Sequence, residues 1–569
     1  MAHMTKTDWA WSGRPLKVRA DQSGVGAFRM FRKMMGGVAV AAVLLAAGMA
    51  SAQDFSAAQL SEGIRTISAD EYQGRYPGTE GERMTLAWLQ AQYEAMGLEP
   101  GGPDGQWLQP VELKRYTPVA GATAGWTGPD GVVHALTPGT DIVLRAATND
   151  GRASIRDAGL VFVGHGIHAP ERQWDDYGTV DVRGRIVIVM PGEPEDARFN
   201  GAYQTAYASA AAKADEAFRR GAIGILTLVP GDAASSMWQG SVRGNGRTRT
   251  LAPGAADLEF SGGINHDIAA AWAAAAGLDI ARLPNVGDGT FRAVALPGVT
   301  LSVEVSETIA TLVTHNLLAR IPGTERPNET IVYSAHWDHV GGAAQHPGVV
   351  GDQIWNGAWD NASGTVGVVE MARQLSAAPR PKRSIVFAHM AAEEMGLLGA
   401  YGYTANPVWP LETTVADINI DMLPLSAPTR DLPIFGKGQN DLEDRLQVLA
   451  AAEGRVVTDD REPDQNYYYR SDHFPFARAG VPAIMPWHGV DLDEGGTAVG
   501  LPAYRAKFAA DYHKASDEWS AELDFSSAVE NLTLLYRLGL DLANSRDWPA
   551  WKPMSEFASV RARSDAARQ

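Results

Sequence analysis

The chain is 569 residues long, 45% of them are hydrophobic, and its formal net charge is −18. This length is enough for roughly two or three globular domains, and the acidic excess argues against a nucleic-acid-binding protein, which would need a basic surface. The chain has no cysteine, which excludes a disulfide framework and any thiol nucleophile or thiolate metal ligand.

The first 52 residues are typical of an export signal with an N-terminal extension. Arg29, Arg32 and Lys33 lie before an apolar run at residues 36–49, and the small residues ending at Ala52 fit a signal-peptidase cleavage site. The apolar run is too short and too rich in alanine and glycine for a transmembrane helix. We therefore expect cleavage near Ala52, a periplasmic or secreted mature protein, and no membrane insertion after cleavage.

Two helical patterns, at residues 56–67 and 82–96, follow this segment and flank a glycine-rich turn. From about residue 117 the sequence changes to short β-prone runs separated by glycines, such as residues 159–167 and 182–190. Near residue 311 the glycine-separated β-prone runs end, and the pattern of the α/β domain that precedes residue 117 resumes. This change predicts a β-rich region inserted between two parts of an α/β domain.

A β-prone run at residues 330–333 leads into the sequence Ser-Ala-His-Trp-Asp-His-Val-Gly-Gly, so we expect His336 and Asp338 where a strand meets a loop. A metal-bound histidine usually needs a second group that fixes the direction of its ring, and a carboxylate two residues along the chain can supply that group. On its own, His336 is more simply explained as a buried core histidine. The interpretation as a ligand depends on the rest of the chain.

Four segments further along the chain carry more candidate ligands. Asp360 precedes an apolar helical pattern, and the pair Glu393–Glu394 follows a strand-like run. Asp421 ends an alternating strand pattern, and His513 lies in the fourth segment. Each segment alone has a structural explanation, such as a helix cap or an acidic first helical turn. Together, two histidines and three carboxylates suit two divalent ions at the carboxyl ends of the strands of an α/β sheet.

The order and spacing of these segments resemble the co-catalytic two-zinc aminopeptidase family, which includes bacterial leucyl aminopeptidases, glutamate carboxypeptidase II and the transferrin receptor ectodomain. The resemblance extends from about residue 55 to about residue 545. It implies the zinc aminopeptidase fold, an α/β fold with a mixed central sheet flanked by helices and an inserted β-rich protease-associated domain. The implied parts are the signal and extension (1–52), the first part of the catalytic domain (53–125), the inserted domain (126–308), the second part of the catalytic domain (309–545) and a C-terminal segment (546–569).

The resemblance also implies roles for individual side chains. The five implied ligands of two divalent ions, which we expect to be zinc, are His336, Asp360, Glu394, Asp421 and His513. Asp360 is the implied bridge, with His336 and Asp421 on one ion and Glu394 and His513 on the other, and a cis peptide bond is implied at Asp360–Asn361. The implied catalytic residues are Glu393 as general base, Asp338 as the group that orients His336, and Tyr512 as a donor to the oxyanion.

Three further features lie near these segments. His339 matches no ligand position, and we interpret it as a supporting or structural residue. His473 is interpreted as a wall of the substrate pocket, because similar segments lie near the substrate in the family. Residues 467–470, three tyrosines and an arginine, belong either to a specificity pocket or to a partly buried loop.

We expect an exported two-zinc exopeptidase, first of all an aminopeptidase that acts on peptides with a free N-terminus. Two zinc ions polarise the scissile carbonyl and acidify a water, and a carboxylate base such as Glu393 carries the water proton to the leaving amine. Asp421 favours an aminopeptidase, since family members that trim N-termini usually have aspartate there. The alternatives are a carboxypeptidase or amidohydrolase of the glutamate carboxypeptidase type, a one-metal glutaminyl cyclase-like acyltransferase, and a non-enzymatic receptor-like ectodomain, against which the complete ligand set argues.

Overall fold

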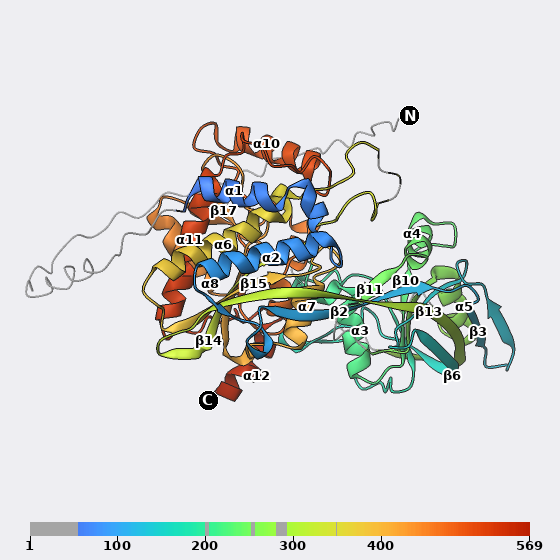
Figure 1. Ribbon diagram of the computed structural model, residues 1–569. Helices are drawn as coiled ribbons and strands as arrows, with labels where there is room; N and C mark the ends of the chain where they lie inside the picture. The colour runs from blue at the N-terminus through green and yellow to red at the C-terminus, as the bar shows by residue number, and fades with distance from the viewer. Residues whose placement is uncertain are drawn as a thin grey trace, which may run out of the picture. The chain divides into compact units, whose positions relative to one another are not determined.

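The structure is a computed structural model that describes residues 55–199, 204–251, 257–279, 293–346, 348 and 350–568 (Figure 1). The predicted export signal lies outside the described residues. Within these ranges no helix is long and apolar enough to cross a membrane.

A mixed sheet forms the centre of the part of the chain that carries the predicted ligands. Its strands, in spatial order, are β19 (Ala483–Ile484), β16 (Thr414–Asn419), β14 (Arg326–His336), β15 (Arg383–Met390) and β13 (Val294–Ile321). The first four strands are parallel to one another, and β13 is antiparallel to β15. Two further strands, β1 (Glu99–Pro100) and β2 (Leu108–Pro118), pair antiparallel with β13. The predicted mixed sheet is therefore confirmed.

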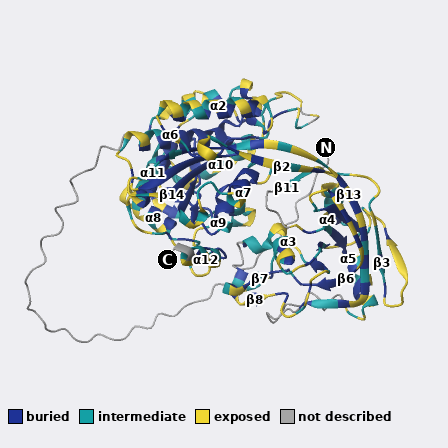
Figure 2. Cartoon of the chain, turned by 60° about the horizontal axis from the view of Figure 1, so that its bottom comes forward, coloured by how far each residue is buried: buried dark blue, intermediate teal, exposed yellow. Residues whose placement is uncertain are grey.

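Helices cover both faces of this sheet. On one side lie α1 (Ala57–Ile67), α2 (Glu80–Ala95), α6 (Ser363–Ala377) and α11 (Ser526–Asn544), and on the other side lie α7 (Leu398–Ala405), α9 (His473–Arg478) and α12 (Ala558–Arg568). Figure 2 shows α2 and α6 on one side of β14 and α9 and α12 on the other. Two more helices, α8 (Leu442–Ala452) and α10 (Gly496–Asp511), and a short parallel pair, β17 (Asp431–Pro433) and β18 (Val456–Thr458), complete this part.

The first helix shows how the pattern of the sequence produces a packed element. Leu60, Ile64 and Ile67 are buried and recur at the spacing of one helical face, so α1 presents an apolar stripe to α6. The side chain of Ser56 accepts a hydrogen bond from the Gln59 backbone N–H at 3.3 Å and caps the helix. The helical patterns predicted at residues 56–67 and 82–96 are confirmed as α1 and α2.

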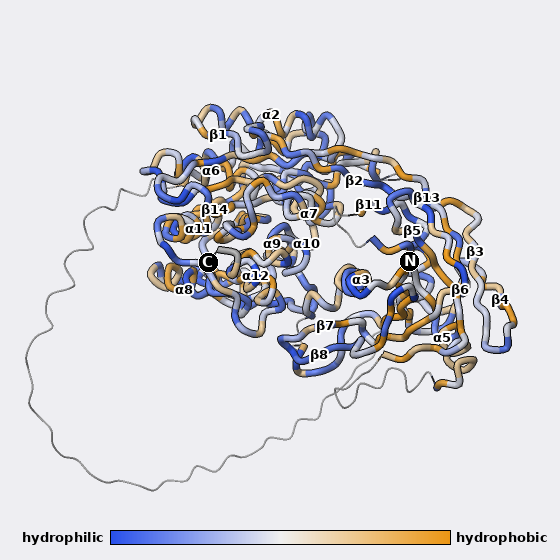
Figure 3. Tube along the Cα trace, turned by 90° about the horizontal axis from the view of Figure 1, so that it is seen from below, coloured by the Kyte–Doolittle hydropathy of each residue, from blue (hydrophilic) through white to orange (hydrophobic). Residues whose placement is uncertain are grey.

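The region between β2 and the end of β13 is rich in strands, as predicted. Its main sheet continues from β13 through β6 (Arg152–Phe162), β9 (Ile186–Val189), β10 (Gly224–Val229), β12 (Phe260–Asn265) and β5 (Ile142–Ala146). The remaining elements are β3 (Thr123–Thr127), β4 (Val133–Leu136), β7 (His168–Ala169), β8 (Trp174–Asp175), β11 (Arg249–Leu251), α3 (Ala210–Arg219), α4 (Ser236–Asn245) and α5 (His266–Ala275). This region has hydrophobic clusters of its own, separate from the core around β14. Figure 3 shows apolar residues along β6 and β13.

Strand β13 takes part in both sheets. Its first half pairs with β3 and β6 as far as Ser306, residues 307–317 pair with β2, and residues 317–321 pair with β15. The change of partners lies beside the predicted boundary at residues 308/309, and the division into domains stays a prediction. The two sheets are thus joined by one continuous strand of 28 residues.

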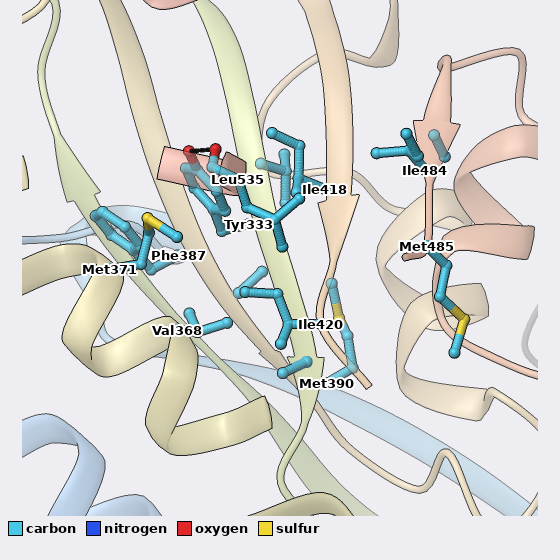
Figure 4. Packing of buried hydrophobic residues seen from close by; sticks show 14 of the residues in the cluster. Tyr333, Val368, Met371, Phe387, Met390, Ile418, Ile420, Ile484, Met485 and Leu535 are labelled. Atoms are coloured by element: carbon cyan, nitrogen blue, oxygen red, sulfur yellow. Dashed lines mark hydrogen bonds between the residues drawn. The ribbon is translucent and has the colours of Figure 1, made fainter. Parts of the chain in front are cut away.

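The core beneath the predicted site is built on β14, which is buried without interruption from Thr330 to His336, as is typical of a central parallel strand. Tyr333 lies in this stretch and donates a hydrogen bond from its hydroxyl to the Leu535 carbonyl of α11 at 2.9 Å (Figure 4). A Cβ atom on Gly539 would lie 1.9 Å from that hydroxyl oxygen, so only glycine fits there.

We expect Gly539→Ala to lower the free energy of unfolding by about 1–3 kcal/mol through overpacking, although alanine is the better helix former. Urea unfolding of the variant measures this change. Tyr333→Phe removes the closest atom, so the double variant should lose less than the sum of the single losses. Gly244→Ala in α4, where nothing lies within 4 Å of the added Cβ, is the matched control and should not destabilise the protein. Equal stability of Gly539→Ala and the parent would contradict this packing.

Candidate metal centre

His336 stands at the carboxyl end of β14 and faces two carboxylates. Its Nε2 lies 3.2 Å from Asp421 Oδ1 and 3.4 Å from Asp360 Oδ1. Its Nδ1 lies 3.1 Å from the Asp338 backbone carbonyl oxygen, an acceptor that leaves the Nε2 lone pair directed at the carboxylates. The ligand atoms of His336, Asp360 and Asp421 lie within 4.8 Å of one another. This is a three-residue group able to hold a cation.

A second group lies on the other side of Asp360. His513 Nε2 lies 3.1 Å from Asp360 Oδ2 and 2.9 Å from Glu394 Oε2. His339 Nδ1 lies 2.9 Å from Glu394 Oε1, and His339, Asp360 and Glu394 also have ligand atoms within 4.8 Å of one another. All five predicted ligands are therefore brought together, and the two oxygens of Asp360 face two different histidines.

The residues fit two zinc ions in both chemistry and spacing. Ligand atoms of a tetrahedral zinc lie roughly 3.3 Å from one another, close to the separations between these nitrogen and oxygen atoms. Burial opposes positive charge on His336, but the carboxylates of Asp421, Glu393 and Asp360 outweigh burial and raise its pKa well above the usual range. For His513, burial is likewise outweighed by Asp360 and Glu394, which raise its pKa to about 10. Both histidines lie where the surrounding carboxylates stabilise positive charge, which bound metal ions would supply.

Asp338 supports the neighbouring carboxylates. Its Oδ1 accepts the Glu393 backbone N–H at 3.0 Å and its Oδ2 accepts the Glu394 N–H at 3.4 Å, whereas Oδ1 lies 3.9 Å from His336 Nδ1. The contact predicted between Asp338 and His336 is made in this structure by the backbone carbonyl. The Asp338 side chain holds the turn that presents both glutamates.

Two residues that the sequence did not single out hold Asp360. The Asp517 carboxylate accepts the backbone N–H groups of Trp359 and Asp360 at 2.8 and 2.9 Å. Arg75 is fully buried and donates to the backbone carbonyls of Trp337, Asn356 and Gly357 at 2.6–2.8 Å and to that of Asp360 at 3.4 Å. The cis peptide bond implied at Asp360–Asn361 is present.

The Glu393 carboxylate lies beside the first group, with Oε2 at 3.9 Å from His336 Nε2. Its side chain is 11% exposed and lies in the wall of the cavity described next. Burial, together with the charges of Glu394 and Asp421, raises the pKa of Glu393 well above its usual range, although His336 acts in the opposite direction. Glu393 is thus a carboxylate that readily accepts a proton.

A small cavity of about 30 Å³ opens onto this group. Its lining residues are His336, Asp360, Glu393, Asp421, Met422, Phe435, Tyr467, Arg470, Ser471, Met485, Trp487, Phe508 and Tyr512. Phe435 packs against Tyr467 and Trp487 with ring centroids 5.2 and 4.8 Å apart, so one wall is aromatic. The Tyr512 ring stacks on His513 at 3.9 Å, which places the predicted oxyanion donor at the mouth of the centre.

The other predicted pocket residues divide between the cavity and the interior. Tyr467 and Arg470 line the cavity, which supports the pocket interpretation for these two. His473 is not among the described lining residues; it is fully buried and packs edge to face on Tyr468 at 4.8 Å. The prediction that His473 forms the pocket wall is therefore wrong, because the start of α9 turns its ring into the core.

Fold and site together define an α/β protein with paired metal-ligand groups at the carboxyl ends of its parallel strands. Residues 316–536 match the family model described as Peptidase family M28. This part of the chain is therefore a domain of peptidase family M28, and the resemblance to zinc aminopeptidases is confirmed for it. The predicted protease-associated region lies outside the matched residues.

Among relatives, the chain is 32% identical over 139 residues to aminopeptidase NAALADL1 of Mus musculus, covering 23% of this chain and 17% of the relative. It is 29% identical over 179 residues to leupeptin-inactivating enzyme 1 of Streptomyces exfoliatus, covering 31% and 36%. The match thus spans little more than a third of these relatives at most. Among solved structures, an aminopeptidase from Aneurinibacillus sp. strain AM-1 has a TM-score of 0.43 at 18% identity, with 87% of this chain and 96% of that chain covered.

We expect two zinc ions per chain after dialysis against dilute zinc, counted by inductively coupled plasma mass spectrometry. Asp360→Asn should lose tight binding of both ions, because Asp360 belongs to both groups, whereas His336→Ala should keep the ion next to Glu394. Zinc should also raise the melting temperature of the wild type, since it binds only the folded chain tightly. Asp464→Asn, at an exposed aspartate, is the control. Two tightly bound ions in Asp360→Asn would contradict the shared-ligand arrangement.

Proposed function

We propose that the chain is an exported two-zinc exopeptidase that removes N-terminal residues from peptides. The observation that carries the proposal is the position of Asp360, whose two carboxylate oxygens face His336 and His513 separately. A shared carboxylate of this kind suits a pair of adjacent ions. The match to family M28 and the name of one relative, aminopeptidase NAALADL1, support a peptidase.

In this proposal the ligands of the two ions are His336, Asp360, Glu394, Asp421 and His513. Bound zinc polarises the scissile carbonyl and acidifies the attacking water. Each of the remaining tasks falls to a side chain of the protein.

Glu393 is the general base. Its carboxylate takes a proton from the water and passes it to the departing amine, and its raised pKa suits both transfers. Asp338 keeps this carboxylate in place through the backbone N–H of Glu393. Tyr512 donates a hydrogen bond to the oxyanion of the tetrahedral intermediate; burial raises the pKa of its hydroxyl, which therefore stays protonated.

The aromatic wall of the cavity receives the side chain of the N-terminal residue. Phe435, Tyr467 and Trp487 offer apolar ring faces close to the metal ligands, and a side chain packed there excludes water from the reacting carbonyl. This arrangement suits an enzyme that removes one residue from the end of a peptide.

Replacing the base should separate metal binding from catalysis. We expect Glu393→Gln to keep two zinc ions and to lower kcat by roughly 10²–10⁴-fold, because glutamine cannot accept the proton. Metal content and hydrolysis of leucyl-4-nitroanilide, measured on the same preparations, give both values. Glu522→Gln, at an exposed glutamate, should behave as the wild type. Near-normal turnover by Glu393→Gln would place the base elsewhere.

A substrate panel tests the exopeptidase class. Aminoacyl 4-nitroanilides with a free N-terminus should be hydrolysed, and the same compounds with an acetylated N-terminus should not. A chelator should abolish the activity and zinc should restore it. Hydrolysis of N-acetylated peptides from the C-terminus would instead establish a carboxypeptidase, and activity that persists after verified metal removal would exclude the two-zinc mechanism.

A further inference from the structure

Arg470 is the one arginine or lysine among the described residues that line the cavity containing His336, Asp360 and Glu393. It follows the short 3₁₀ helix Tyr467–Tyr469, and its backbone N–H donates to the Tyr467 carbonyl at 3.0 Å. The next residue, Ser471, donates from its hydroxyl to Asp421 Oδ2 at 2.7 Å. The residue next to Arg470 in the chain is therefore hydrogen-bonded to Asp421, a candidate metal ligand.

The side chain of Arg470 is supported without a charge partner. Its guanidinium lies 5.1 Å from the centroid of the Tyr467 ring, and its Nη2 is 3.4 Å from the Tyr512 hydroxyl oxygen, a long hydrogen bond. Within the described residues no carboxylate forms an ion pair with it, whereas nearby Arg461 pairs with Asp431 at 2.6 Å. Arg505 likewise pairs with Glu462 at 3.1 Å. The exposed fork of Arg470 thus remains available to a substrate.

A guanidinium held on an aromatic face is well suited to a carboxylate, because its planar fork donates two parallel hydrogen bonds. The same charge repels a cationic side chain of the substrate. A substrate that reaches the metal centre through this cavity therefore gains affinity if it carries a carboxylate close to the scissile bond.

We propose that Arg470 selects substrates with a carboxylate next to the scissile bond. This inference rests on the proposed exopeptidase function and specifies its substrate class. The carboxylate comes either from an acidic N-terminal side chain or from the C-terminus of a very short peptide; both present the same group to Arg470.

Two pairs of isosteric substrates distinguish these sources. The first pair is glutamyl- and glutaminyl-4-nitroanilide, and the second is alanyl-alanine and alanyl-alaninamide. We expect the zinc-loaded wild type to have the lower KM for the carboxylate member of one pair. Arg470→Gln should raise that KM about tenfold or more, and should leave kcat and the KM of the amide substrate nearly unchanged. Arg470→Lys should retain part of the preference for the carboxylate. Arg505→Gln, which alters a paired arginine outside the cavity lining, should change neither pair.

Two results would overturn the proposal. One is a wild type without preference for the carboxylate in either pair. The other is a loss of kcat in Arg470→Gln that is equal for carboxylate and amide, since this would make Arg470 a positioning residue for Tyr512. Calorimetric titration of glutamate and glutamine into the zinc-loaded protein tests recognition without turnover. If no substrate is hydrolysed, the proposed function fails, and tighter binding of glutamate that Arg470→Gln abolishes would still support the Arg470 inference.

Discussion

The structure depends on keeping several carboxylates close together and away from water. Asp338, Asp360, Glu393, Glu394 and Asp421 surround His336 and His513, and a buried set of like charges is unstable unless positive charge balances it. Part of that charge comes from Arg75. Its burial lowers the pKa of the guanidinium to about 10, against the attraction of Asp517, Asp360 and Asp338, so Arg75 remains a cation. The metal ions of the proposed enzyme would provide the rest.

The sheet explains how so many charged groups reach one place. Strands β14, β15 and β16 are parallel, so their carboxyl ends meet along one edge, where His336, Glu393 and Asp421 follow them. Apolar side chains fill these strands below the edge, and the ligands therefore stand on a rigid core. The backbone around them is hydrogen-bonded as well, through Asp517 to Asp360 and through Asp338 to Glu393 and Glu394. The apolar core fixes where the candidate metal centre lies, and the carboxylates of Asp517 and Asp338 fix the backbone that carries its side chains.

Much of this arrangement was predictable from sequence, because strand-end histidines and carboxylates carry both a local pattern and a spacing. The five predicted ligands and Glu393 lie close together, as expected. Arg75 could not be found in this way, since its partner Trp337 is 262 residues away and only the tertiary fold joins them. The sequence indicates a supporting or structural role for His339, and the turn of the loop brings its ring to 2.9 Å from Glu394. For His473 the segment was informative, but the direction of a side chain at a helix start depends on packing that the sequence does not reveal.

Strand β13 has a consequence for the mechanical behaviour of the chain. At about 3.3 Å per residue, its 28 residues give a chain length of about 90 Å. Hydrogen-bonded neighbours line it from the β-rich region to β15, apart from the irregular stretch between Ala295 and Val303. A strand paired in this way can bend and twist, but it is not a flexible hinge as a glycine-rich linker would be. Displacement of the β-rich region therefore strains the same hydrogen-bonded ladder that supports the candidate metal centre. Deletion of the β-rich region would therefore truncate β13, a strand that also belongs to the central sheet around β14.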